Sequence, residues 1–228
     1  GEPCKAHPFG TDEYGRDILS RILYGSRVSI SIGIVAQIVA SIVGIALGSL
    51  AGYYGGWLDS VISRVMEIFQ AFPDLIFAMA IMTFMGKGVL NLFIALGLLT
   101  WVRTARMIRA SVMQLKEKEY IEASRACGAS TYWIIMKGLV PNCLSTIIVL
   151  VTLGIPNAIM YEASLSFLGI GIQPPTPSWG NMISAAQTFI SYRPVYSIMP
   201  GVAIMITVIA FNIFGDGLRD ALDPKLRG

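Results

Sequence analysis

The sequence is poor in the residues that bind transition metals. Its 228 residues include one histidine, His7, and three cysteines that fall in separate segments without CxxC spacing. Structural zinc and iron–sulfur sites need clustered Cys and His ligands. We therefore expect no metal site, and we interpret Cys4, Cys127 and Cys143 as packing residues.

Motifs for nucleotide, acyl or metalloprotease chemistry are also absent. The sequence contains no GxxxxGK(S/T) phosphate-binding loop, no GxSxG turn and no HExxH pattern. No series of Asp, Glu and His residues runs through successive apolar segments, as it does in many proton-driven carriers. The chain is therefore predicted to be non-enzymatic, without catalytic residues or a cofactor of its own. If it moves a solute, another polypeptide supplies the energy.

Charged residues are scarce as well. They make up 14% of the chain, against about 25% in soluble domains, while 54% of the residues are hydrophobic. The stretch 28–58 contains no charged side chain, and about 20 apolar residues are enough to cross a bilayer as a helix. These features predict an all-α, multi-pass membrane protein embedded in lipid. A formal net charge of +3 is too small to indicate a nucleic-acid partner.

Five membrane spans are predicted, at about 28–52, 65–86, 89–108, 143–169 and 194–215. The distribution of Lys and Arg determines their orientation, because basic loops remain in the cytoplasm. Eleven basic residues fall on one side of the membrane and six on the other. The eleven are Arg64, Arg103, Arg106, Arg109, Lys116, Lys118, Arg125, Lys137, Arg219, Lys225 and Arg227. Their side is therefore predicted to be cytoplasmic.

This orientation divides the chain into three parts. Residues 1–27 form an extracytoplasmic segment, residues 28–215 form the transmembrane domain, and residues 216–228 form a cytoplasmic tail. A polar cytoplasmic loop at about 110–142 interrupts the transmembrane domain. The N-terminal segment is predicted to lie outside the cytoplasm, yet it shows no signal-peptide pattern. We therefore expect a further span upstream, which would give six spans in the complete chain.

Glycine recurs every four residues in the first span, at Gly44, Gly48 and Gly52. Small residues at this spacing allow another helix to approach closely in lipid. The stripe is compatible with packing inside the chain and with a subunit interface.

Three acidic residues within the predicted spans are candidates for a transport pathway, since burying a charge in a bilayer costs at least about 2.5 kcal/mol. Glu67 could instead pair with Arg64, three residues away. Asp74 follows Pro73, which interrupts the second span, and could cap the helix that restarts there. Glu162 could either face the pathway or bond within or between subunits.

The loop contains the polar stretch EYIEASRACGAS at 119–130. A short helix is predicted there, ended by Gly128 in a left-handed conformation. Ser130 is expected to cap a second helix, which Pro141 would close before the fourth span. The resulting helix–turn–helix could lie on the membrane surface as an amphipathic loop. It could also dock a cytoplasmic motor protein.

This loop resembles the EAA motif of ABC importer permeases, EAA-x3-G-x9-I-x-L-P. Glu122-Ala123-Ser124, Gly128 and Pro141 match the motif with the correct spacing. Two positions depart from it, because Gly138 stands where the motif has Ile and Val140 where it has Leu.

Three further segments, 9–29, 162–182 and 211–227, resemble the second permease of dipeptide, oligopeptide and nickel importers. The resemblance covers essentially the whole chain and implies a type I ABC importer permease fold in a bacterial or archaeal cytoplasmic membrane. It also implies a similar second permease, two cytoplasmic ATPases that use ATP and Mg²⁺, and an extracytoplasmic binding protein. Peptides are favoured as substrates because no His- or Met-rich pathway is evident; nickel or another small solute is the alternative.

By the same resemblance, the EAA loop is a coupling helix seated on an ATPase. Glu122 would pair with a cationic or donor group, Ala123 would allow close approach, and Gly128 would turn the chain. On the outer side, Pro175 and Trp179 are candidates for contact with the binding protein. Trp179 could instead lie in the aromatic belt at the membrane surface.

The GTDEYGRD segment at 10–17 is predicted to form a local turn network in which Asp12, Arg16 and Asp17 pair with neighbours. A calcium site is not expected, because two Asp and one Glu do not make a ligand loop. Two rival functions remain open. A channel or secondary carrier would work without an ATPase, and a membrane-embedded enzyme would need convergent titratable residues on adjacent spans.

Overall fold

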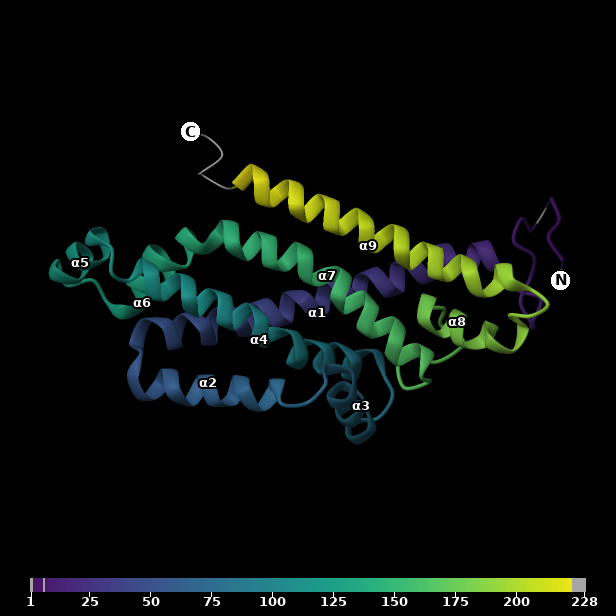
Figure 1. The fold of residues 1–228 in the computed structure, drawn as a ribbon, viewed down its shortest axis with the longest axis horizontal. Coiled ribbons are helices and arrows are strands. Elements are labelled where there is room, and N and C mark those ends of the chain that lie inside the picture. The colour runs from purple at the N-terminus through teal and green to yellow at the C-terminus, as the bar shows by residue number, and fades with distance from the viewer. Residues whose placement is uncertain (1, 6, 223–228) are drawn as a thin grey trace. The chain divides into compact units, whose positions relative to one another are not determined.

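The computed structural model describes residues 2–5 and 7–222, and these residues are mainly helical (Figure 1). The α-helices are α1 Ile18–Tyr54, α2 Gly56–Gln70, α3 Asp74–Met85, α4 Val89–Leu115, α5 Glu119–Ala126, α6 Thr131–Trp133, α7 Leu144–Phe167, α8 Trp179–Ala186 and α9 Pro194–Leu222. A π-helix at Ile134–Leu139 and a 3₁₀ turn at Pro141–Cys143 link α6 to α7. The described part of the chain contains isolated β-bridges but no strand.

Four helical stretches are long and apolar enough to cross a membrane: α1, α4, the run Thr131–Phe167 and α9. They correspond to the first, third, fourth and fifth predicted spans. The second predicted span is not one straight helix. It is the pair α2 and α3, bent by 91°. Proline lacks the backbone donor that would continue the helix, and Pro73 immediately precedes α3.

The ends of the spans also differ from the prediction. Helix α1 begins at Ile18, well before residue 28, because Asp17 caps it by accepting a hydrogen bond from the Ser20 backbone at 2.7 Å. Helix α9 continues to Leu222, so the first part of the predicted tail is helical. Residues 223–228 of that tail lie outside the described residues.

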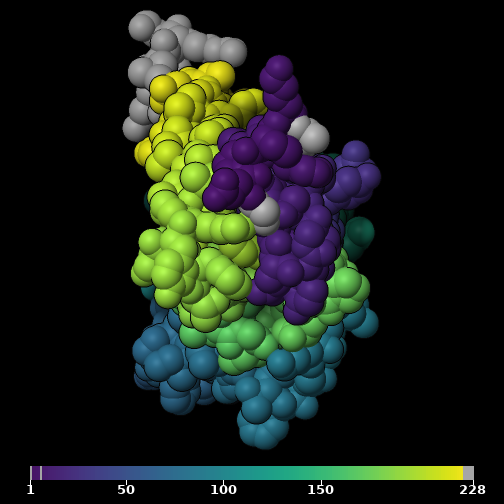
Figure 2. Space-filling view, turned by 90° about the vertical axis from the view of Figure 1, so that its right-hand side faces the viewer, coloured from purple at the N-terminus to yellow at the C-terminus, as the bar shows by residue number. Residues whose placement is uncertain are grey.

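The chain divides into two compact units, and α1, α4, α7 and α9 each contribute residues to both. The first unit contains residues 1–36, 75–96 and 155–213, and the second contains 37–74, 97–154 and 214–228. The core of the first unit includes Ile22, Ile159, Trp179 and Met182. On its surface the N-terminal segment lies against the α8–α9 connection, purple beside yellow-green in Figure 2.

In the second unit, the glycine stripe of α1 packs on α4. A Cβ atom on Gly44 would lie 2.6 Å from Cβ of Thr104, and one on Gly52 would lie 2.7 Å from the Arg109 carbonyl oxygen. Gly48 meets the backbone of Ala105 in the same way. The stripe therefore serves packing inside the chain, the first of the two predicted alternatives.

Pro141 and Pro156 both lie within the helical run Thr131–Phe167 without ending it. Pro156 lies inside α7. Before Pro141 the helix widens, with Val140 N–H donating to the Ile135 carbonyl at 2.9 Å, and after it the helix tightens, with Cys143 N–H donating to the Val140 carbonyl at 3.0 Å. The expectation that Pro141 closes a separate helix is wrong, because the π turn and the 3₁₀ turn together make room for the proline.

Only one of the three cysteines is a packing residue. Cys143 is buried in the second unit, whereas Cys4 and Cys127 are exposed. The interpretation of all three as packing residues is corrected accordingly.

Candidate functional site

Helix α5 is a short polar helix that contacts the π-helix Ile134–Leu139 (Figure 1). Ile121 is its one buried residue, 0% exposed, and it joins a cluster with Ile108, Val112 and Leu139. Burying one such side chain contributes about 1.5–3 kcal/mol. A single apolar anchor thus attaches α5 to α4 and to the π-helix, while the rest of the helix faces outward.

Gly138 makes room for that anchor. A Cβ atom at this position would lie 2.9 Å from Cδ1 of Ile121. The departure from the EAA motif at position 138 is therefore matched by the bulk of Ile121 opposite.

The outward face of α5 carries the motif residues. Glu122 and Ala123 are exposed, and the Ser124 hydroxyl donates to the Tyr120 carbonyl at 2.7 Å. The guanidinium of Arg125 lies 5.8 Å from the ring centre of Tyr53, within reach of a cation–π attraction. Glu122 and Ala123 therefore remain available for an external contact.

The turn after α5 has the predicted geometry. Gly128 adopts φ +80°, a conformation that other residues rarely adopt, and nothing lies within 4 Å of the place where its Cβ would be. Ser130 caps α6, because its side chain accepts a hydrogen bond from Trp133 N–H at 3.3 Å. Both predictions are confirmed.

A hollow of about 530 Å³ opens between α5 and α6, lined by Ala123, Ser124, Cys127, Gly128, Ala129, Ser130 and Trp133. It brings together three of the five predicted coupling residues, Ala123, Ser124 and Gly128. Glu122 is exposed on the same helix, and Pro141 is exposed on the 3₁₀ turn.

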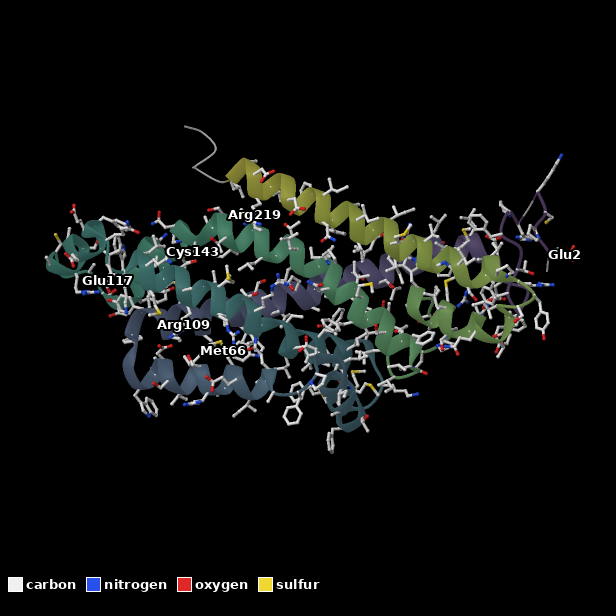
Figure 3. All side chains as sticks on the ribbon, viewed as in Figure 1. Glu2, Met66, Arg109, Glu117, Cys143 and Arg219 are labelled. Atoms are coloured by element: carbon white, nitrogen blue, oxygen red, sulfur yellow. The ribbon has the colours of Figure 1, made fainter. Side chains whose placement is uncertain are left out.

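Polar contacts fix α2 to α4 in the same unit. The guanidinium of Arg109, labelled in Figure 3, donates to both carboxylate oxygens of Asp59, with the Nη2–Oδ2 distance at 2.6 Å. Arg106 donates to the Gln70 side chain, and the rings of Phe69 and Trp101 meet edge to face at 5.6 Å. Helix α4, which leads into α5, is thus braced against α2 over residues 101–109.

The predicted pathway residues lie in different surroundings. Glu67 is exposed and pairs with Arg64 at 2.7 Å, as predicted. Asp74 is the first residue of α3, where the positive end of the helix dipole stabilises a carboxylate. Glu162 is fully buried and accepts hydrogen bonds from Ser29 at 2.8 Å and Ser166 at 2.7 Å. Its burial favours bonding within the chain over a pathway position.

Trp179 is a core residue, which corrects both predicted alternatives. It is 2% exposed, and its indole N–H donates to the Ile22 carbonyl at 3.1 Å. A side chain so enclosed reaches neither a binding protein nor the membrane surface. Pro175, in the preceding loop, is exposed.

The GTDEYGRD segment forms the predicted turn network. Asp12 accepts hydrogen bonds from the backbone N–H groups of Tyr14 and Arg16, both at 2.9 Å, and from the Arg16 side chain at 2.7 Å. Asp17 contacts His7 at 3.0 Å. Hydrogen bonds from Ser20, aided by His7, hold the pKa of the Asp17 carboxyl below its usual value. Among residues 2–5 and 7–222, no three His, Cys, Asp or Glu side chains gather as a metal site.

Two structural partnerships were missed at the sequence level. Ile121 could have been recognised as the isolated aliphatic residue of a polar helix. The Asp59–Arg109 pair joins residues 50 positions apart, and no local pattern indicates it.

Comparison with known proteins identifies the chain's family. Residues 44–228 match the family described as the binding-protein-dependent transport system inner membrane component. The chain belongs to this family. It is therefore a membrane permease of a transport system that depends on a binding protein, and its predicted location in the inner membrane is confirmed.

Several relatives of this permease match nearly its whole length. It is 44% identical over 225 residues to the glutathione transport system permease protein GsiD of Pectobacterium atrosepticum, covering 99% of this chain and 75% of that protein. It is 45% identical to the dipeptide transport system permease protein DppC of Alkalihalophilus pseudofirmus, covering 99% and 74%. The oligopeptide transport system permease protein OppC of Bacillus subtilis is 43% identical, with the same coverage.

Solved structures confirm the predicted fold. A chain of the MetNI methionine ABC transporter in an inward-facing conformation matches with a TM-score of 0.72 and 21% identity, covering 90% of the permease and 98% of that chain. A chain of an amino acid ABC transporter solved with histidines matches with a TM-score of 0.67 and 14% identity, covering 90% and 95%. The permease therefore has the fold of ABC transporter membrane subunits.

Proposed function

We propose that this permease is one of two similar membrane subunits of an ABC importer that moves short peptides into the cytoplasm. The proposal is supported by relatives named for glutathione, dipeptide and oligopeptide transport, all more than 40% identical to this chain. The permease itself is non-catalytic in this proposal. Two cytoplasmic ATPases would bind ATP and Mg²⁺, and an extracytoplasmic binding protein would deliver the peptide.

The surface of α5 and its hollow is proposed to be the ATPase docking site. The observation that carries this assignment is the single buried anchor Ile121, which leaves the motif residues exposed beside a hollow of about 530 Å³. Ala123 lines the hollow without filling it, so a side chain of the ATPase can enter. Glu122 offers a carboxylate for a cationic or donor group on the same partner.

Coupling requires an element that both the ATPase and the transmembrane helices bias. Through Ile121, α5 contacts α4 and the π-helix, and α6 belongs to the helical run Thr131–Phe167. A displacement of α5 by the ATPases would therefore act on two spans together. Gly128 holds the turn between α5 and α6, and Pro141 lies where that run enters α7.

Transport by the intact complex tests the proposal. The complex is purified through a tag on this permease and reconstituted into liposomes with its binding protein. Uptake of labelled dipeptide, glutathione, a hexapeptide and Ni²⁺ is then measured with and without ATP. We expect ATP-dependent uptake of at least one peptide. Uptake of Ni²⁺ alone would favour the metal alternative, and peptide uptake by the permease without ATPases would show an autonomous carrier.

Ala123→Trp tests the docking site, because the indole would project into the hollow and obstruct it. This variant should lose co-purifying ATPase and ATP-driven uptake, yet keep its affinity for the binding protein. Trp57→Ala, which changes an exposed residue on α2, is the matched control. It should retain both the co-purifying ATPase and ATP-driven uptake. Normal uptake by Ala123→Trp would contradict the assignment of α5.

A further inference from the structure

A second hollow, of about 340 Å³, lies on the first unit between the N-terminal segment and the α8–α9 connection. It is lined by Thr11, Asp12, Glu13, Phe189, Tyr192, Arg193 and Tyr196. Figure 2 looks onto this face, where the purple N-terminal segment meets the yellow-green connection. None of the predicted site residues lines it.

The base of the hollow is fixed, and one buried carboxylate there faces two guanidinium groups. The Asp12 side chain is fully buried, bonded to Arg16, and lies 3.6 Å from Nε of Arg21. Tyr196 is buried, and its ring packs 6.1 Å from that of Phe189. Asp12 is therefore a structural residue and is not available to a ligand.

Three polar side chains at the hollow are uncommitted. Within residues 2–5 and 7–222, the carboxylate of Glu13, the guanidinium of Arg193 and the hydroxyl of Tyr196 have no hydrogen-bond or ion-pair partner. Arg193 and Tyr196 offer donors one helical turn apart. A carboxylate of a bound partner could accept hydrogen bonds from these donors, and a basic group of the same partner could pair with the Glu13 carboxylate.

Exposed apolar residues line the hollow, as Tyr192 does, or adjoin its lining residues in the sequence, as Tyr14 and Ile190 do. Tyr192 is 81% exposed, Tyr14 73% and Ile190 57%. Tyr and Arg are enriched at the energetic centres of protein interfaces. A dipeptide in the hollow would not cover Tyr14 and Ile190 as well, so the surface favours a protein partner.

The predicted orientation places this surface outside the cytoplasm. Residues 1–17 and the α8–α9 connection both lie opposite the basic loop in the sequence of membrane crossings. The family is defined by its dependence on a binding protein, which is an extracytoplasmic partner in the proposed function.

We propose that this hollow docks the binding protein, which inserts an acidic side chain toward Arg193 and Tyr196 and places a basic side chain against Glu13. The assignment rests on the proposed function. It replaces the contact predicted for Trp179 with one formed by the α8–α9 connection.

The experiment measures the affinity of the system's own purified binding protein for the intact complex in nanodiscs. Arg193→Ala should weaken binding by about tenfold or more, and Arg193→Glu should weaken it further. Tyr196→Phe keeps the packed ring and should have a smaller effect. Affinity for the wild-type complex should fall as salt is raised. The matched control, Arg27→Ala, removes the same charge from the exposed surface of α1 and should bind normally.

The outcomes separate this inference from the proposed function. Unchanged affinity in both Arg193 variants, with ATP-driven peptide uptake intact, would overturn the docking site alone. If Arg193→Ala instead abolishes stimulation of ATPase activity by free dipeptide in the absence of binding protein, the hollow is a peptide site and the inference is wrong. Failure of the wild-type complex to take up any peptide would count against the proposed function, whatever the binding data show.

Discussion

Ile121 and Gly138 are complementary in size: a Cβ atom on Gly138 would lie 2.9 Å from the terminal carbon of the fully buried Ile121. Helix α5 is attached through this fit. Gly138→Ile should therefore destabilise the permease by about 1–3 kcal/mol, as overpacked cores generally are. Ile121→Ala should cost about 2–4 kcal/mol through the cavity it leaves.

The double variant Ile121→Ala with Gly138→Ile restores the side-chain volume. Its loss of stability should be smaller than the sum of the losses in the two single variants, by a coupling energy of about 0.5–3 kcal/mol. Thermal unfolding of the complex in nanodiscs measures all three variants. Strictly additive losses would show that the two residues do not share one packing site.

Gly128 turns the chain at φ +80° with open space beside it. Gly128→Val should cost about 1–2 kcal/mol through backbone strain alone and should lower ATP-driven peptide uptake. Gly128→Asn, a residue that tolerates the left-handed region, should retain most of the uptake. Equal loss of uptake in both variants would indicate that the partner requires the absence of a side chain, not the turn.

Asp59 and Arg109 hold α2 against α4 through a bidentate ion pair. Arg109→Met leaves a half-buried carboxylate without its partner and should destabilise the permease by about 1–3 kcal/mol. Adding Asp59→Leu removes the unpaired charge and should recover part of the loss. The midpoints of thermal unfolding for the two single variants and the double variant give the coupling energy, which should differ from zero.

Gly48 lies against the backbone of Ala105. Gly48→Ala should push α1 away from α4 and destabilise the permease by about 1–3 kcal/mol. Gly201→Ala on α9 is the matched control, because nothing lies within 4 Å of its Cβ position; it should be neutral or stabilising by up to about 1 kcal/mol. Comparable unfolding temperatures for the two variants would contradict close packing at Gly48.

Asp17 caps α1 and contacts His7. Asp17→Ala should lower the free energy of unfolding by about 1 kcal/mol, whereas Asp17→Asn retains the cap and should lose less. The pKa of this carboxyl is lower in the folded protein than its usual value of 3.8. The stabilisation by its charge is therefore present above that value and is lost as the pH falls through the folded pKa. Unfolding temperatures of wild type and Asp17→Asn should converge as the pH falls below 3.8 and through the folded pKa.

Local chemistry was sufficient to predict much of the fold. The lengths of the apolar stretches located four spans, because any helix that crosses a bilayer needs about 20 apolar residues. Gly128 and Ser130 were predictable because a left-handed turn and a helix cap each depend on one residue and its immediate neighbours. Pro73 indicated an interruption, but the 91° bend depends on how the two halves pack.

The features that could not be predicted depend on distant partners. Trp179 looked like a surface aromatic in a Pro-rich loop, yet its indole bonds to a carbonyl 157 residues away. The burial of Glu162 likewise depends on Ser29, 133 residues away. Both contacts are formed only when α1, α7 and α8 assemble. The proposed docking hollow combines residues 11–13 with 189–196, which no spacing rule brings together.

The π turn before Pro141 and the 3₁₀ turn after it have a mechanical consequence. They let the proline lie within one helical run from Thr131 to Phe167, so the chain passes from α6 into α7 without an intervening loop. A displacement at the α6 end therefore reaches α7 through continuous helical backbone.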